Sequence, residues 1–318
     1  MRATPDQPPA YVHIGSAKAG SKSLQQHFFG AHPQLGHGGM GVGGPVGWVT
    51  PALQRRIEAD LRCMKPLLYD PAPVADAWAE AAALLAGPDV RRVGLSYENL
   101  TLTHGLDVDI TEKARRVCAM LGPDLKVVHV VREQRQTLRS GYGELLLNGH
   151  DQGFSDTIDD MLRTHVRSWI SDLCHGRVAA LWAGLVGREN LHVIPFESLR
   201  DNPEPVLAGL CAFLGVDPLP CVLERENRGL DGVQLAALLM LNQQMRHDLS
   251  DRTVSVFQAD RLGAHLDATW PELPATRRFA NATLGRAAAA AIRDPRRLPA
   301  LPPMVLGFRP DQDQMLQR

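Results

Sequence analysis

Four short runs of apolar residues stand out along the chain, near residues 11–15, 92–96, 126–131 and 191–195. The third, Leu125-Lys-Val-Val-His-Val-Val131, is almost continuously β-branched, which is typical of a strand covered on both faces in a parallel sheet. Longer segments with helical character lie between and after the runs, near residues 73–86, 154–173, 177–186, 203–215 and 232–245. This alternation predicts an α/β fold in which helices flank a mainly parallel sheet.

The same pattern predicts a single domain over residues 1–318. Residues 1–10 predict a flexible amino terminus, and residues 248–318 predict a helical extension followed by a proline-rich tail. The glycine-rich segment Gly36-His-Gly-Gly-Met-Gly-Val-Gly-Gly-Pro45 predicts a mobile surface loop between the first two apolar runs.

Composition narrows the class of protein. The chain has 318 residues, of which 44% are hydrophobic and 22% are charged, and its formal net charge is −1. A dedicated nucleic-acid binder would carry a basic excess, so we expect no nucleic-acid partner. No stretch reaches the roughly 18 uninterrupted apolar residues of a membrane span, and the first ten residues lack an apolar signal core, so we expect a cytoplasmic protein. Five scattered cysteines without a CxxC pair predict buried thiols rather than a disulfide or a metal site.

The most informative stretch follows the first run and extends from Gly15 to Ser23, with glycines, serines, alanines and two lysines. Backbone with such small side chains can approach a ligand closely, and the N–H groups at the start of the following helix attract anions. A nucleotide-hydrolysing P-loop requires Gly, four residues and then Gly-Lys-Ser/Thr, whereas here Ser21 separates Gly20 from Lys22. The spacing therefore predicts a phosphate-binding loop that differs from a Walker loop.

Two further strand ends carry polar candidates. Glu98 follows the second run, at the carboxyl edge where sites of open α/β sheets lie, and it is either a general base or an acidic residue that begins a helical turn. Arg132 follows the third run and Ser140 comes about two helical turns later, so the two side chains are candidates for one phosphate site. The structural alternative is a surface ion pair for Arg132 and a backbone hydrogen bond for Ser140.

The loop Lys18-Ala-Gly-Ser-Lys-Ser23 and the later Arg-x7-Ser-x-Tyr pattern from Arg132 to Tyr142 resemble, in this order, the two phosphate sites of sulfotransferases that use 3′-phosphoadenosine 5′-phosphosulfate (PAPS). The segments at residues 96–100 and 226–229 resemble those of the bacterial, carbohydrate-type members. The resemblance implies a P-loop-kinase-like architecture with helical additions over the carboxyl edge of the sheet. It also implies an enzyme that transfers a sulfuryl group from PAPS to a hydroxyl of a carbohydrate or other small molecule, without a metal.

The resemblance implies a role for each candidate residue as well. Lys18 would stabilise charge on the leaving phosphate oxygen, and Glu98 would accept the acceptor's proton. The 3′-phosphate would bind Arg132 and Ser140, while Arg228 would either reach that phosphate or cap the following helix. The 5′-phosphate would bind the loop made of Lys18, Ala19, Gly20, Ser21, Lys22 and Ser23.

Lys22 departs from the family pattern, because many relatives have a threonine at this position. It either holds the phosphosulfate, points away, or marks a loop that binds without catalysis. An ATP-dependent small-molecule kinase and a non-catalytic module that binds a nucleotide or a sulfated ligand therefore remain alternatives. The kinase would need a carboxylate for magnesium where Arg132 stands. His104 is a rival base to Glu98, whereas His13 and His129 lie within predicted strands and are predicted core residues.

Overall fold

The computed structural model describes residues 8–16, 18–40, 47–103, 108–147, 149–164, 170–220, 223, 230–248, 304 and 306–316. Its contacts group the chain into two compact units, Met1–Thr137 with His165–Glu226, and Leu138–Thr164 with Asn227–Arg318. The sequence prediction of a single domain stays a prediction beside this division.

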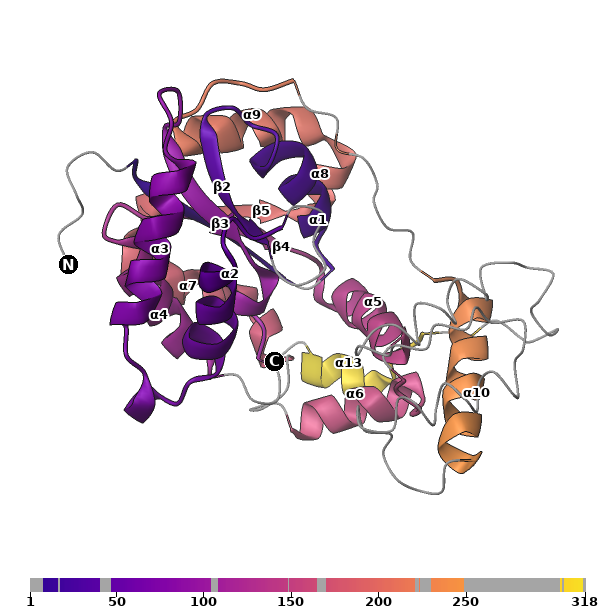
Figure 1. Ribbon diagram of the computed structural model, residues 1–318. Helices are drawn as coiled ribbons and strands as arrows, with labels where there is room; N and C mark the ends of the chain where they lie inside the picture. The colour runs from indigo at the N-terminus through magenta and orange to yellow at the C-terminus, as the bar shows by residue number, and fades with distance from the viewer. Residues whose placement is uncertain are drawn as a thin grey trace. The chain divides into compact units, whose positions relative to one another are not determined.

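The first unit is built on a parallel sheet of five strands in the described part of the chain, in the order β2-β3-β1-β4-β5 (Figure 1). The strands are β1 (Ala10–Gly15), β2 (Leu35–Met40), β3 (Arg92–Ser96), β4 (Lys126–Val131) and β5 (Leu191–Pro195). Four of them match the predicted apolar runs to within a residue. The predicted α/β class, with a parallel sheet flanked by helices, is confirmed.

The fifth strand, β2, corrects the prediction of a mobile loop at the glycine-rich segment, since the first five residues of that segment are its Gly36 to Met40. These glycines permit close packing rather than mobility. A Cβ at Gly36 would lie 2.8 Å from the backbone oxygen of Leu85, and one at Gly38 would lie 3.1 Å from the backbone oxygen of Gly94. Neighbouring backbone therefore passes too close to β2 for larger side chains.

Helices of the first unit cover both faces of the sheet. Their bounds are α1 (Ser21–Leu24), η1 (Gln25–Phe29), α2 (Pro51–Arg55), η2 (Arg56–Leu61), η3 (Pro66–Leu68), α3 (Ala72–Leu85), η4 (Glu98–Leu100), α4 (Ile110–Leu121), η6 (Ser171–Leu173), α7 (His175–Val186), η7 (Arg188–Asn190), α8 (Phe196–Asp201) and α9 (Pro203–Leu214). Helix α5 (Gln134–Leu147) begins in the first unit and continues in the second.

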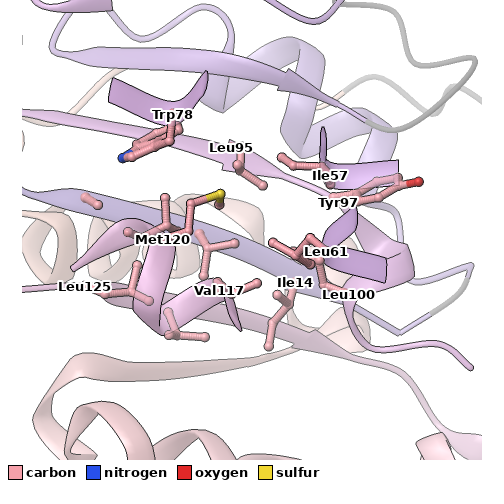
Figure 2. Close-up of a cluster of buried hydrophobic side chains, with 14 of the residues drawn as sticks. Ile14, Ile57, Leu61, Trp78, Leu95, Tyr97, Leu100, Val117, Met120 and Leu125 are labelled. Carbon is pink, nitrogen blue, oxygen red and sulfur yellow. The ribbon is translucent and has the colours of Figure 1, made fainter. Parts of the chain in front are cut away.

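The alternation of side chains along β1 divides the core into two clusters. Val12 and Ile14 belong to the cluster that α3, α4 and α7 complete, which includes Trp78 and Val117 (Figure 2). Tyr11 belongs to the opposite cluster, which α1, η1, α8 and α9 complete. Because both faces of β1 are covered, the sheet holds the carboxyl ends of β1 and β4 in a fixed register.

The second unit contains the rest of α5 together with α6 (Phe154–Arg163), α10 (Gly232–Asp248) and α13 (Pro310–Leu316). Asn242 of α10 donates to the carbonyl oxygen of Leu146 at 2.8 Å. Arg309, just before α13, forms paired hydrogen bonds with Asp159 of α6 at 2.7 and 2.8 Å. Part of the predicted carboxyl-terminal extension is therefore an ordered helix that packs on α6, and its residues 249–303 lie outside the described residues.

The described cysteines correct the expectation of buried thiols, because only one of the four is buried. Among the four that the structure describes, Cys211 is buried, Cys63 and Cys118 are half-buried, and Cys174 is exposed. All four are free thiols, and Cys221 lies outside the described residues. Within the described ranges, no cluster of three or more metal-ligating side chains is present, and no helix is long and apolar enough to span a membrane.

Candidate active site

Three polar segments follow the carboxyl ends of neighbouring strands in the first unit, as the sequence predicts. The loop from Ser16 to Gly20 follows β1, the turn at Glu98 follows β3, and Arg132 follows β4. Since β1 lies between β3 and β4, the three segments share one edge of the sheet.

Two left-handed residues shape the loop after β1. Lys18 has φ 63° and Gly20 has φ 76°, and Gly20 directly precedes α1. The Gly20 carbonyl accepts the amide of Ser23 at 3.1 Å, which begins the helix, while the Ser16 amide is bonded to the Val130 carbonyl of β4 at 2.8 Å. The helix widens into a π-helical turn at Gln25–Phe29. The loop therefore turns tightly between β1 and a helix start, which is the layout of an anion-binding loop.

The predicted loop residues differ in exposure. Ala19 and Ser21 are buried, Ser23 is half-buried, and Lys22 is exposed. The Ser21 hydroxyl is buried beneath the loop without a hydrogen-bond partner. Lys22 is exposed to solvent, and its role in the loop stays a prediction.

Arg132 connects β4 to the loop. Its Nη1 donates to the carbonyl oxygen of Lys18 at 2.7 Å, and its guanidinium lies 5.1 Å from the ring centre of Phe196. Burial lowers the pKa of Arg132, and the nearby Glu197 carboxylate opposes this change. A guanidinium nevertheless stays charged in proteins. Its Nε is buried without a hydrogen-bond partner in the described part of the chain.

Phe196, at the start of α8, contributes to this site and is not among the predicted site residues. A Cβ at Gly20 would lie 2.7 Å from Cε2 of Phe196, so the ring packs directly on the glycine. The carboxylate of its neighbour Glu197 accepts a hydrogen bond from the amide of Glu133 at 3.2 Å and braces the turn after β4. Phe196 therefore touches both the loop and Arg132 (5.1 Å), which holds these two segments in register.

Glu98 begins the turn η4 and is half-buried. The hydroxyl of Thr101 donates to the carbonyl oxygen of Gly15 at 2.6 Å and to that of Glu98 at 2.9 Å, which fastens this turn to the end of β1. Further along, the Thr103 amide donates to Asp172 at 2.6 Å, and burial raises the pKa of that carboxyl. Glu98 thus lies in a turn that hydrogen bonds fix to the end of β1, beside the loop that contains Lys18 and Gly20.

His175, at the start of α7, is a second residue that the sequence analysis missed. Its Nε2 donates to the carbonyl oxygen of Arg132 at 2.8 Å, and its Nδ1 lies 3.4 Å from the hydroxyl of Ser16. Burial lowers the pKa of His175, which favours the neutral ring. No local pattern marks this residue, because its partners stand 43 and 159 positions away.

The remaining predicted residues are placed differently. Ser140 lies on α5 in the second unit and is half-buried. Arg228 and His104 lie outside the described residues. His13 and His129 are buried core residues, as predicted. The convergence of Arg132 and Ser140 on one phosphate stays a prediction.

The comparisons with known proteins agree with the motif resemblance. Residues 108–220, about one third of the chain, match the model of the sulfotransferase family. This segment carries Arg132 and Ser140 and begins after the Lys18 loop and Glu98. No curated protein sequence matches the chain. The predicted resemblance to sulfotransferases is confirmed by the family match.

Several solved structures show a limited likeness. A sulfotransferase from Alicyclobacillus acidocaldarius is 18% identical, covers 79% of this chain and 98% of its own, and gives a TM-score of 0.48. A mouse sulfotransferase complexed with PAP is 13% identical, covers 98% of this chain and 81% of its own, and gives a TM-score of 0.41. The sulfotransferase domain of the curacin biosynthetic pathway is 14% identical, covers 82% of this chain and 98% of its own, and gives a TM-score of 0.42.

Proposed function

From the sulfotransferase-family match of residues 108–220, we propose that the chain transfers a sulfuryl group from PAPS to a hydroxyl of a carbohydrate or other small molecule. One observation carries the proposal. Arg132, inside the matched segment, donates from Nη1 to the carbonyl oxygen of Lys18 in the loop outside it, at 2.7 Å. The two motifs that resemble the two phosphate sites are therefore in direct contact.

The residues fit the nucleotide. The amides of Gly20, Ser21 and Lys22 at the helix start would hold the 5′-phosphate, which also gains the positive end of the helix dipole. The guanidinium of Arg132 would bind the 3′-phosphate, which is the role that the resemblance gives it together with Ser140. An adenosine nucleotide without a 3′-phosphate would leave this guanidinium donor unused.

The transfer itself needs a base, an acceptor and a stabilised leaving group. Glu98 would accept the proton of the acceptor hydroxyl. The acceptor oxygen bonds to sulfur while the bond from sulfur to the 5′-phosphate oxygen breaks. That oxygen gains negative charge, which Lys18 would stabilise. The products are the sulfated acceptor and 3′-phosphoadenosine 5′-phosphate (PAP).

Ligand-induced thermal stabilisation tests the nucleotide site. With divalent metals chelated, PAP should raise the melting temperature of the chain more than ADP at equal concentration, because charged hydrogen bonds to the 3′-phosphate contribute roughly 1.5–3 kcal/mol, or about tenfold or more in affinity. Arg132→Gln should remove most of this difference. Arg115→Gln, an exposed arginine on α4, is the matched control and should keep it.

Transfer is then measured with sulfur-labelled PAPS and pooled carbohydrate, phenol, lipid and peptide acceptors. Transfer of the label from PAPS to an acceptor in the absence of metal ions would support the proposal. Equal protection by PAP and ADP would overturn the assigned 3′-phosphate site. Protection by PAP without transfer to any pool would favour the non-catalytic module, and magnesium-dependent use of ATP would favour the kinase.

A further inference from the structure

A line of hydrogen-bonded polar side chains runs through the core beneath the loop. The side-chain amide of Gln25 in η1 donates to the hydroxyl of Ser96 in β3 at 2.7 Å, and this hydroxyl lies 2.6 Å from Nδ1 of His13 in β1. The exposed fractions of the three residues are 4%, 0% and 0%. Burying polar groups is costly unless each one is hydrogen-bonded, so the end of this line is informative.

The chemistry of the three groups assigns the hydrogens. The amide nitrogen of Gln25 is only a donor, so the Ser96 oxygen accepts from it. Burial, with smaller effects from His37 and His129, lowers the pKa of His13 to about 3, so the ring is neutral near pH 7 and carries one hydrogen. We assign the hydrogen of the Ser96 hydroxyl to Nδ1, because the described residues offer this hydroxyl no other acceptor, and the ring hydrogen is then on Nε2.

The line ends at two unsatisfied atoms. Nε2 of His13 and the hydroxyl oxygen of Ser21 are both buried without a hydrogen-bond partner. Both lie close to Gly15, where a Cβ would be 2.7 Å from the Ser21 oxygen and 3.7 Å from Nε2. The absent side chain of Gly15 thus leaves a space that a buried donor and a buried hydroxyl share.

We propose, on the basis of the proposed function, that His13 is a positioning residue for the phosphate loop. In the nucleotide complex its Nε2–H donates to the Ser21 oxygen, and Ser21 keeps its own hydrogen for the 5′-phosphate. The line from Gln25 through Ser96 to His13 orients every hydrogen in one direction, and such chains strengthen each other's bonds. A neutral core histidine thereby selects the orientation of a hydroxyl that the ligand needs.

A double-mutant cycle on PAP affinity, measured calorimetrically with metals chelated, tests this coupling. His13→Phe keeps the stacking on Phe29, whose ring centre lies 5.0 Å away, and removes both nitrogens. This variant and Ser21→Ala should each weaken PAP binding roughly fivefold, and the double variant should be no weaker than Ser21→Ala alone. His37→Phe is the matched control, because this half-buried histidine lies near the same Phe29 ring (6.0 Å), and it should bind PAP as the wild type does.

The wild-type chain gives a second readout that needs no variant. On addition of PAP, the nitrogen resonance of His13 Nε2 should shift, and those of His37 should not. Additive losses in the cycle, or an unshifted His13 resonance in a chain that binds PAP, would overturn the role of His13 and leave the proposed function intact. Absence of PAP binding by the wild-type chain would overturn both.

Discussion

Acidification should destabilise the first unit, because His13, His37 and His129 have the largest downward pKa shifts among its described histidines and stay neutral in the folded chain. Burial is the main cause that lowers the pKa of His13 and His129 from 6.5 to about 3, and that of His37 from 6.5 to about 4. In the unfolded chain all three regain their ordinary pKa and bind protons that the folded chain does not bind. The free energy of unfolding should therefore fall as the pH drops below 6.5 toward 4.

The magnitude follows from the gap between the pH and the ordinary pKa. At about pH 5 each unfolded histidine lies roughly 1.5 pH units below its pKa, which costs the folded state about 2 kcal/mol. Three such residues give a loss of about 6 kcal/mol, a large part of the roughly 5–15 kcal/mol that stabilises a typical domain. Burial raises the pKa of Asp172, which acts in the opposite direction, whereas burial lowers the pKa of His175 and His192, which adds to the loss.

Urea unfolding, followed by the fluorescence of the buried Trp78 and Trp182, measures this loss between about pH 7 and pH 5. His37→Phe removes one of these titrating groups and should therefore show less pH dependence. An unfolding free energy that stays constant over this range, or a folded-state titration of His13 near its ordinary pKa, would refute the reasoning.

Three other changes test the site and the fold. Lys18→Ala should lose most turnover yet keep much of the affinity for PAP, because the role proposed for Lys18 is to stabilise charge that grows in the transition state; comparable losses of both in steady-state kinetics and calorimetry would contradict this. Glu98→Gln should lower acceptor turnover roughly 10²-fold or more with PAP affinity unchanged. Near-normal turnover of that variant, beside an inactive but folded His104→Ala, would move the base to His104. Gly94→Ala should abolish stable folding as judged by circular dichroism, because its Cβ would lie 2.1 Å from the backbone oxygen of Tyr11.

The buried strands were predictable because their sequence property is local. Val127, Val128 and Val130 are covered on both faces of β4, and a run of β-branched residues reports this directly. Strand β2 was not predictable in the same way. Its glycines at 36 and 38 are required because the backbone of Leu85 and Gly94, which are distant in sequence, lies close to them. Glycine content alone does not separate a close approach from a loop.

The residues of the candidate site likewise divide into those that local sequence predicts and those that depend on contacts with distant segments. The residues at strand ends, Arg132 and Glu98, were predictable because the carboxyl ends of parallel strands share one edge. Phe196 and His175 were missed because each acts through a contact with a segment distant in sequence. His13 was recognised as a core residue, but its link to Ser96 depends on the register between β1 and β3, which pairs the two residues.

The left-handed backbone of Lys18 lowers the thermal stability of the loop, whereas its side chain carries the ammonium group proposed for catalysis. A non-glycine residue in this conformation costs roughly 1–2 kcal/mol, which the hydrogen bond from Arg132 to its carbonyl oxygen helps to offset. Glycine at this position would relieve the strain, so we expect Lys18→Gly to melt at a higher temperature while it loses the ammonium group. Directed evolution that selects survivors of heating alone would therefore enrich inactive variants at this position, and a selection for robust catalysts has to score turnover in every round.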